Sequence, residues 1–220
     1  MSVTFEEIKN NKAIQTYITR ADESLSALGY TEHSFPHVMR VCETAVYIMR
    51  TLSYDEHEIE LVKIAGYMHD IGNLVNRVDH SQSGAVMAFR ILDKFGMEAD
   101  DIAKIVSTIG NHDEGTGVPI NAMAAALILA DKSDVRRSRV RNTDISAFDI
   151  HDRVNYSVRS SKLIIDDERK NIILTLEIDP NFSSVMDYFE IFLNRMILCR
   201  KAAEKLGLRF KLVINGQQLI

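Results

Sequence analysis

The sequence predicts a mainly α-helical fold that ends in a small β-β-α-β module. From Phe5 to about Arg141, apolar residues recur at helical spacing almost throughout, which is typical of amphipathic helices packed into a bundle. After about residue 150, two short segments instead alternate apolar and polar residues, as half-buried strands do. We therefore expect a helical domain over residues 1–150 and a small α+β module over residues 151–220.

Capping signals divide the helical part into segments. A first amphipathic segment begins at Phe5. Ser34 is placed as an N-cap with Pro36 in the following turn, and Ser53 with Glu56 matches a capping box. Glycines end the later helices, and proline precedes the last of them. These later helices are expected over Ser53 to Gly72, Asp79 or Ser81 to Gly96, Ile102 to Ile109, and Ala122 to about Val140.

The C-terminal module contains a predicted hairpin, a helix and a third strand. The hairpin strands surround a charged turn at residues 167–170, and a serine caps the helix. Because the module is too small for much core of its own, we expect it to pack on the helical part. The expected elements are strands over Val158 to Asp166 and Asn171 to Asp179, a helix from Ser183 or Ser184 to about Leu206, and a strand over Leu208 to Ile214.

Composition indicates an ordinary soluble protein. Hydrophobic residues make up 46% of the chain and charged residues 26%, which argues against extensive disorder. A net charge of −5 leaves no global nucleic-acid footprint. No apolar run approaches the roughly 20 residues of a membrane span, and the N-terminus lacks the pattern of a signal peptide. Cys42 and Cys199 are far apart without a CxxC motif, so we expect reduced thiols and a cytoplasmic protein.

Asp131 is the sharpest single chemical signal. It follows a nine-residue stretch, Ala122 to Ala130, that is apolar on every side. A lone ionised carboxylate there would cost several kcal/mol unless it were paired or bound to a cation. The alternatives are a structural ion pair with Arg136, Arg137 or a histidine, and a metal site.

Four histidines and a second aspartate occupy comparable positions. His69 and Asp70 close an apolar helical run, His37 lies in a first helical turn, His112 continues an apolar face, and His80 stands at a helix start. Each alone is more often structural than functional. Together with Asp131, they sit at the ends of different helices, as in metal sites inside helical bundles. The remaining histidines lie in polar or loop contexts and are expected to be solvated: His33, His57 and His151.

The order of these residues resembles that of a known family. The ordered set is His37, His69-Asp70, His80, His112 and Asp131, with Arg40, Gly72, Gly84 and Lys132 in the flanking segments. Over roughly residues 30–140, this set closely resembles the HD-domain metal-dependent phosphohydrolase superfamily and implies an HD-domain helical bundle. The resemblance implies that His37, His69, Asp70 and Asp131 hold a primary metal, with Asp70 able to bridge to a second.

His80 and His112 resemble the extra histidines of the dinuclear branch, which includes HD-GYP phosphodiesterases and HD-type diadenosine tetraphosphate hydrolases. Both groups usually carry a lysine where this chain has Asn73. The positive charge of that lysine must therefore be supplied by another residue, and Arg77 and Arg40 are the candidates. HD-GYP proteins also have a histidine in place of Asn111 and a longer loop. Cyclic dinucleotide hydrolysis is therefore not favoured.

The run from Asp131 to Arg141 adds a basic patch beside the predicted centre. If this run forms a continuous helix, Arg136 and Arg139 lie on either side of the line that passes through Asp131 parallel to the helix axis. Arginines bind phosphate oxygens bidentately, although a solvated basic face is the simpler reading of any one of them. As a group they favour an anionic substrate, and Arg40, Arg77, Arg136 and Arg139 are the candidate substrate-binding residues.

We therefore predict a metal-dependent phosphohydrolase that acts on a phosphate ester or anhydride of a small, nucleotide-like molecule by attack of metal-activated water. Asp70 and His69 are the expected catalytic residues, and Asp113 or Glu114 could assist. The expected cofactor is one or two divalent ions, with Fe or Mn favoured over Zn, Co, Ni and Mg because histidines stand beside carboxylates. No membrane or extended nucleic acid partner is expected.

Two other classes of function remain open from the sequence. Some members of the superfamily use a di-iron centre for oxygenation, and ligand sets alone do not separate them from hydrolases. The chain could also be a ligand sensor without turnover, with the C-terminal module as a partner surface or homodimer surface. The intact six-residue ligand set argues against the sensor.

Overall fold

The computed structural model describes residues 3–220, so the first two residues of the predicted helical domain lie outside it. The α-helices are α1 (Phe5–Lys9), α2 (Lys12–Ala27), α3 (Phe35–Thr51), α4 (Glu56–Met68), α5 (His80–Lys94), α6 (Ala99–Gly110), α7 (Ala122–Ser133), α8 (Ile150–Ser157) and α9 (Val185–Lys205). Short 3-10 turns are η1 (Ile71–Leu74), η2 (Arg137–Arg139) and η3 (Ile145–Ala147). The strands are β1 (Val158–Ile165), β2 (Asn171–Ile178), β3 (Arg209–Ile214) and β4 (Gln217–Gln218).

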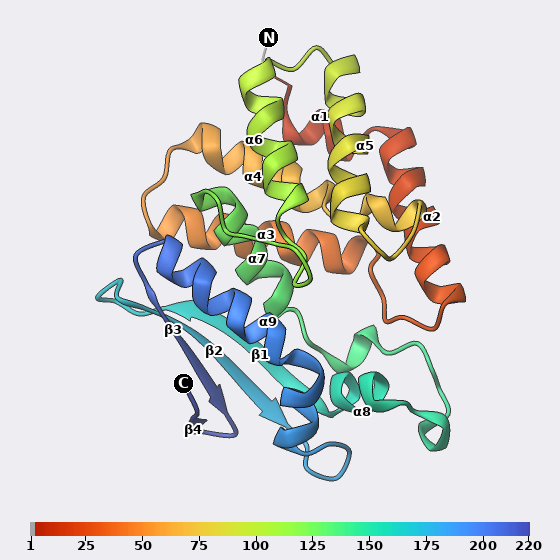
Figure 1. The fold of residues 1–220 in the computed structure, drawn as a ribbon, viewed down its shortest axis with the longest axis vertical. Helices are drawn as coiled ribbons and strands as arrows, with labels where there is room; N and C mark the ends of the chain where they lie inside the picture. Colours follow the sequence, from red (N-terminus) through yellow and green to blue (C-terminus); the bar gives the residue numbers. More distant parts are fainter. Residues whose placement is uncertain (1–2) are drawn as a thin grey trace.

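The predicted fold class is confirmed, since a mostly helical chain ends in a small sheet (Figure 1). The sheet has the order β1-β2-β3-β4. β1 and β2 form an antiparallel hairpin, and α9 crosses over so that β3 runs parallel to β2. Leu174 lies at the centre, paired with Leu163 on one side and Leu212 on the other. None of the helices in residues 3–220 combines the length and the apolarity required to cross a membrane.

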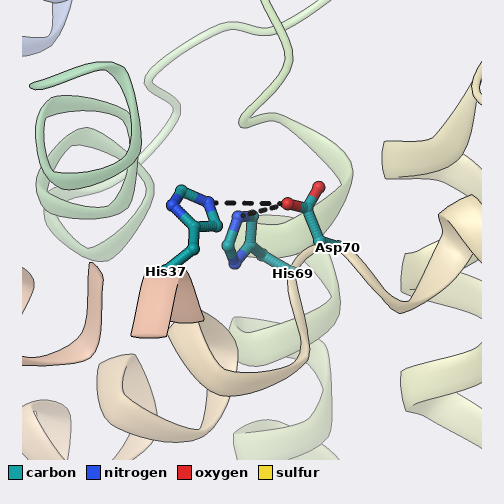
Figure 2. Close-up of side chains that lie close together, drawn as sticks. All are labelled: His37, His69 and Asp70. Atoms are coloured by element: carbon teal, nitrogen blue, oxygen red, sulfur yellow. Dashed lines mark ion pairs between the residues drawn. The ribbon is translucent and has the colours of Figure 1, made fainter. Parts of the chain in front are cut away.

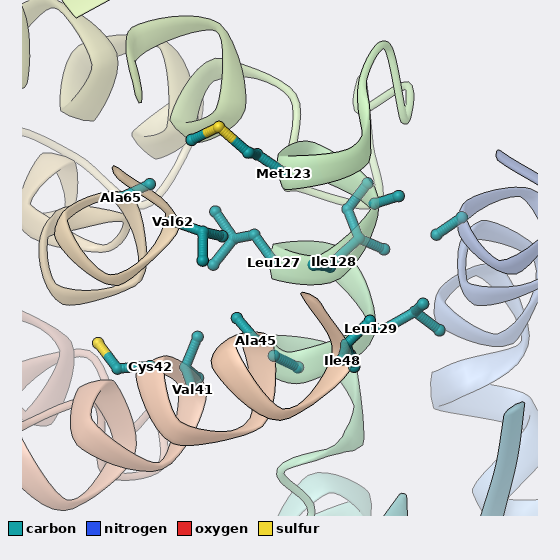
Figure 3. Packing of buried hydrophobic residues seen from close by; sticks show 14 of the residues in the cluster. Val41, Cys42, Ala45, Ile48, Val62, Ala65, Met123, Leu127, Ile128 and Leu129 are labelled. Atoms are coloured by element: carbon teal, nitrogen blue, oxygen red, sulfur yellow. The ribbon is translucent and has the colours of Figure 1, made fainter. Parts of the chain in front are cut away.

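Helix α7 is the centre of the core. It packs against α3, α4, α6 and α9, which explains why its sequence is apolar on every side. Val62 of α4 and Leu127 of α7 point toward each other, and both are fully buried (Figure 3). α9 lies between the sheet and α7 (Figure 1). The C-terminal module is packed on the helical part, as we expected from its small size.

Gly72 lets two helical segments approach unusually closely. A Cβ at this position would lie 1.9 Å from the carbonyl oxygen of His80 and 2.4 Å from the backbone nitrogen of Gly84. Only glycine permits this contact between η1 and the first turns of α5. The contact brings the segment that carries Asp70 against the one that carries His80, and so assembles part of the predicted site.

Two predicted helix boundaries are wrong. α7 ends at Ser133 and does not continue to about Val140, because the backbone of Asp134 leaves the helical conformation. The arginines beyond Asp134 therefore do not form one helical face with Asp131. The capping box at Ser53 is also wrong. Ser53 has a positive φ of 64°, and the cap of α4 is Asp55, whose side chain accepts from the backbone of Glu58.

Candidate metal centre

Four histidine rings are anchored through the same nitrogen. His69 Nδ1 lies 2.8 Å from the carbonyl of Gly66, and His80 Nδ1 and His112 Nδ1 lie 3.1 and 2.7 Å from backbone carbonyls one turn earlier. His37 Nδ1 lies 2.8 Å from the Oδ2 of Asp134. Since a carbonyl or carboxylate oxygen only accepts, each Nδ1 carries the proton. In each neutral ring, the free electron pair is therefore on Nε2.

These Nε2 atoms surround the carboxylate of Asp70. One oxygen, Oδ2, lies 3.6 Å from His37 Nε2 and 3.2 Å from His69 Nε2 (Figure 2). The other oxygen, Oδ1, lies 3.4 Å from His80 Nε2 and 3.9 Å from His112 Nε2. Each oxygen of Asp70 thus faces its own pair of imidazoles, an arrangement in which one carboxylate can contact two neighbouring cations.

Asp131 completes the cluster from the last turn of α7. Its Oδ1 lies 3.4 Å from His37 Nε2 and 3.9 Å from His69 Nε2, and its Oδ2 lies 2.8 Å from Lys132 Nζ. Burial by itself would raise the pKa values of Asp70 and Asp131. The neighbouring histidines, and Lys132 for Asp131, nevertheless hold both pKa values well below their usual range. Both carboxylates are therefore ionised at neutral pH.

The cluster has the chemistry of a cation site. Among the described residues, His37 Nε2 and His69 Nε2 are buried without a hydrogen-bond partner. His80 Nε2 and His112 Nε2 face each other at 3.1 Å, where two unprotonated nitrogens repel unless a cation lies between them. Three overlapping triads have donor atoms within 4.8 Å of one another: His37-His69-Asp70, His69-His112-Asp131 and Asp70-His80-His112. The donors fit a divalent ion that accepts mixed nitrogen and oxygen ligands.

Asp134 orients His37 and was not found by sequence reasoning. Burial and the charge of Arg139 would lower the pKa of His37, yet Asp131, Asp134 and Asp70 raise it to about 10. A carboxylate behind a ligating imidazole fixes the ring and increases its basicity. The only available signal was the spacing of Asp134, three residues after Asp131. Because α7 was predicted to continue as a helix past Asp134, the contact of Asp134 with His37 was not expected.

Asn73 connects the cluster to Arg77. Its Nδ2 donates to the backbone oxygen and to Oδ1 of Asp70, at 2.9 and 3.0 Å. Its Oδ1 accepts from Arg77 Nη1 at 3.3 Å, and the same Nη1 lies 3.4 Å from His80 Nε2. A neutral side chain therefore orients Asp70, while the nearby positive charge comes from Arg77.

The four candidate substrate-binding arginines are not brought together. Arg77 lies beside the centre and forms no ion pair within residues 3–220, whereas Arg40 and Arg136 pair with Asp134. Arg40 and Arg136 line a separate groove next to β1. Arg139 is buried and donates to backbone oxygens, but it borders the same cavity as Arg77.

The loop between α6 and α7 supplies two further carboxylates with different partners. Asp113 Oδ1 lies 4.0 Å from His80 Nε2. Glu114 is held between Lys132 Nζ at 2.6 Å and Arg195 Nε at 2.8 Å. Burial would raise the pKa of Glu114, but these two cations keep it well below its usual range. Arg195 carried no signal in the sequence, since it is one arginine on a long amphipathic helix.

His33 was predicted to be solvated, but its side chain is half-buried. Its ring lies 5.4 Å from that of His37, and its Nδ1 lies 2.6 Å from the carbonyl of Thr31. Burial and the charge of Arg139 lower its pKa well below the ordinary value. The chain between α2 and α3 folds back over the centre, which the local polarity of this segment could not indicate. His57 and His151 are exposed as predicted.

Comparison with known proteins gives one family and two relatives. The model of the HD domain family matches residues 35–153. The chain is 24% identical to the uncharacterized protein MJ1020 of Methanocaldococcus jannaschii, over 75% of this chain and 72% of that protein. It is also similar to the crystal structure of a predicted HD superfamily hydrolase from an uncultured Thermotogales bacterium. That match has 24% identity and a TM-score of 0.45, and covers 57% of this chain and 68% of the other.

Proposed function

This chain belongs to the HD domain family, whose model matches more than half of its length, and from this premise we propose that it is a metal-dependent phosphohydrolase. HD domains bind divalent metal ions. The observation that carries the proposal is the convergence of four Nδ1-anchored imidazoles on the two oxygens of Asp70. Family membership supports a metal-dependent hydrolase, and the finer assignments rest on the residues around the centre.

We propose that His37, His69, Asp70 and Asp131 hold one ion, and that His80 and His112 hold a second with Asp70 between the two. The mixture of imidazoles and carboxylates favours Fe or Mn over Mg. When bound, such ions supply Lewis acidity toward phosphoryl oxygens and lower the pKa of a coordinated water. Asp134 and Asn73 orient their ligand partners in this arrangement.

The surrounding residues fit an anionic substrate. Arg77 is placed to bind a phosphate oxygen because it lies beside His80 and forms no ion pair within the described chain. Glu114 is already held by two cations. Asp113 forms no ion pair with a lysine or arginine in residues 3–220, so its Oδ1 is the better candidate to accept or return a proton during hydrolysis.

Metal analysis of anaerobically purified protein, followed by a phosphate-release screen over nucleotides and dinucleotides, tests the proposal. Substitution of Asp70 by Ala should remove both bound metal and turnover, since both halves of the cluster share this carboxylate. Asp93→Ala provides the control, because it removes an exposed aspartate from the last turn of α5. Full metal occupancy and activity in the Asp70→Ala protein would contradict the assignment.

The same screen separates the other two classes of function. Oxygen-dependent turnover at an iron centre, with no phosphate released, would identify an oxygenase. Ligand binding without turnover in every metal-loaded form would identify a sensor. Either result would replace the phosphohydrolase proposal.

A further inference from the structure

We infer that the C-terminal module completes the substrate pocket, and that the substrate is a phosphomonoester about the size of a nucleoside monophosphate. The inference rests on the proposed function and adds to it the class of substrate. It assigns a role to α9, which lies beyond the last residue matched by the HD domain model.

A cavity of about 410 Å³ lies beside the metal centre, within the range of pockets that hold a single small ligand. Its wall near the centre contains His33, Arg77 and Glu114. His33 packs against His37 and Arg77 lies beside His80, whereas Glu114 is connected to Asp131 through Lys132. A ligand in this cavity would therefore have one end next to the residues that surround the centre.

The other walls come from outside the ligand set. One is the segment between α2 and α3, which contributes Tyr30, and the others are α8 and α9. Figure 1 shows α8 below this segment, with the first half of α9 close to it. Ile191 and Phe192 form the apolar part of the α9 wall. The cavity therefore does not exist as an enclosed pocket without the C-terminal module.

A chain of buried and partly buried charges joins α9 to the centre. Arg195 Nε lies 2.8 Å from Glu114 Oε1, Glu114 Oε2 lies 2.6 Å from Lys132 Nζ, and Lys132 Nζ lies 2.8 Å from Asp131 Oδ2. Because the signs alternate, each cation has a carboxylate partner, as buried charges require. Only Nε of Arg195 is used in this chain. The terminal nitrogens of Arg195 have no hydrogen-bond partner in residues 3–220 and can meet an anion in the cavity.

The cavity wall offers groups of both kinds. Arg77, Arg139 and Arg195 border it, and the start of α8 adds Asp149, Asp152 and Asn155. Arginines suit a phosphate, and carboxylate and amide oxygens suit hydrogen-bond donors. Tyr30, in the same wall, is 43% exposed and supports Arg77, whose guanidinium lies 5.5 Å from the ring centre. These features fit a phosphate joined to a compact body that carries amino or hydroxyl groups and a flat ring.

Filling the cavity from α9 tests the inference. Ile191→Trp adds bulk to the wall, whereas Leu193→Trp adds the same side chain at a neighbouring position of the same helix that is 49% exposed and does not border the cavity. With adenosine 5′-monophosphate as the probe, we expect Ile191→Trp to raise KM by about tenfold or more. Leu193→Trp should keep the wild-type KM, and both variants should keep the wild-type metal content.

A binding measurement covers the case in which Ile191→Trp does not fold. The chain has no tryptophan, so Tyr30→Trp places a single fluorophore at the cavity and Leu193→Trp places one outside it. Adenosine 5′-monophosphate should change the emission of the Tyr30→Trp protein and leave that of Leu193→Trp unchanged. If adenosine 5′-monophosphate changed the emission of the Tyr30→Trp protein but the wild type released no phosphate from it, the proposed reaction would be contradicted. The assignment of the cavity as a binding pocket would still hold. An unchanged KM in folded Ile191→Trp, or no emission change in Tyr30→Trp, would overturn the inference.

Discussion

Replacing Gly72 with alanine should damage the half of the centre that contains His80. The added Cβ would lie 1.9 Å from the His80 carbonyl oxygen, against a minimum of 3.0 Å for real Cβ contacts, so the backbones must separate by at least about 1.1 Å. The two nearest obstructing atoms, at 1.9 and 2.4 Å, are backbone and cannot rotate away. Asp70 Oδ1 and His80 Nε2 are now 3.4 Å apart, and a shift of this size would pull them beyond a common cation.

The expected energetic cost is that of an overpacked core, about 1–3 kcal/mol. For a chain of this size, each kcal/mol lowers Tm by about 2–4 °C. We therefore expect Gly72→Ala to lose several degrees of thermal stability and part of its bound metal, measured by thermal denaturation and by metal content per chain. His37 and His69 are not carried by η1 or α5, so the remaining metal should be bound through them.

Gly110→Ala is the matched control. A Cβ at Gly110 would meet its nearest neighbour, the Cβ of Ala85, at 3.6 Å, which is an ordinary contact. This variant should be as stable as the wild type or slightly more stable, because alanine reduces the freedom of the unfolded chain. If Gly72→Ala retained the Tm and metal content of the Gly110→Ala protein, the close approach of η1 and α5 would not assemble the centre as we describe.

Two further measurements follow from the pKa values. The carboxylates around His37 raise its pKa to about 10, so in the metal-free protein its proton must leave before a cation binds. Metal affinity should therefore increase with pH between about pH 6 and 9, with proton release detectable by calorimetry in buffers of different ionisation enthalpy, and a flat profile would contradict this assignment. Burial raises the pKa values of the thiols of Cys42 and Cys199 to about 12. A thiol reagent should consequently modify neither cysteine in the folded protein and both after denaturation, and rapid labelling of the native protein would be inconsistent with this burial.

Local sequence patterns were sufficient for most of the elements, and the order of histidines and aspartates along the chain was sufficient to select the candidate metal ligands. The hairpin, α9 and β3 follow from alternation, a serine cap and a glycine stop, all of which act within a few residues. Asp131 was recognisable because an ionised group at the end of an all-apolar helix needs a partner. The six ligand-type residues were identified from their order along the chain, and the structure brings all six together.

Only the tertiary structure decided what surrounds that set. Asp134 contacts His37 although the two are 97 residues apart in the sequence, and Arg195 contacts Glu114 across 81 residues. Neither pairing is indicated by the sequence around these residues. The end of α7 at Ser133 is another such case, since Asp134 leaves the helix and contacts His37 and Arg139. Helix propensity and periodicity describe how a segment folds by itself. The partners of a buried charge depend on which elements the packed core places beside it, and so they emerge only when the whole chain is folded.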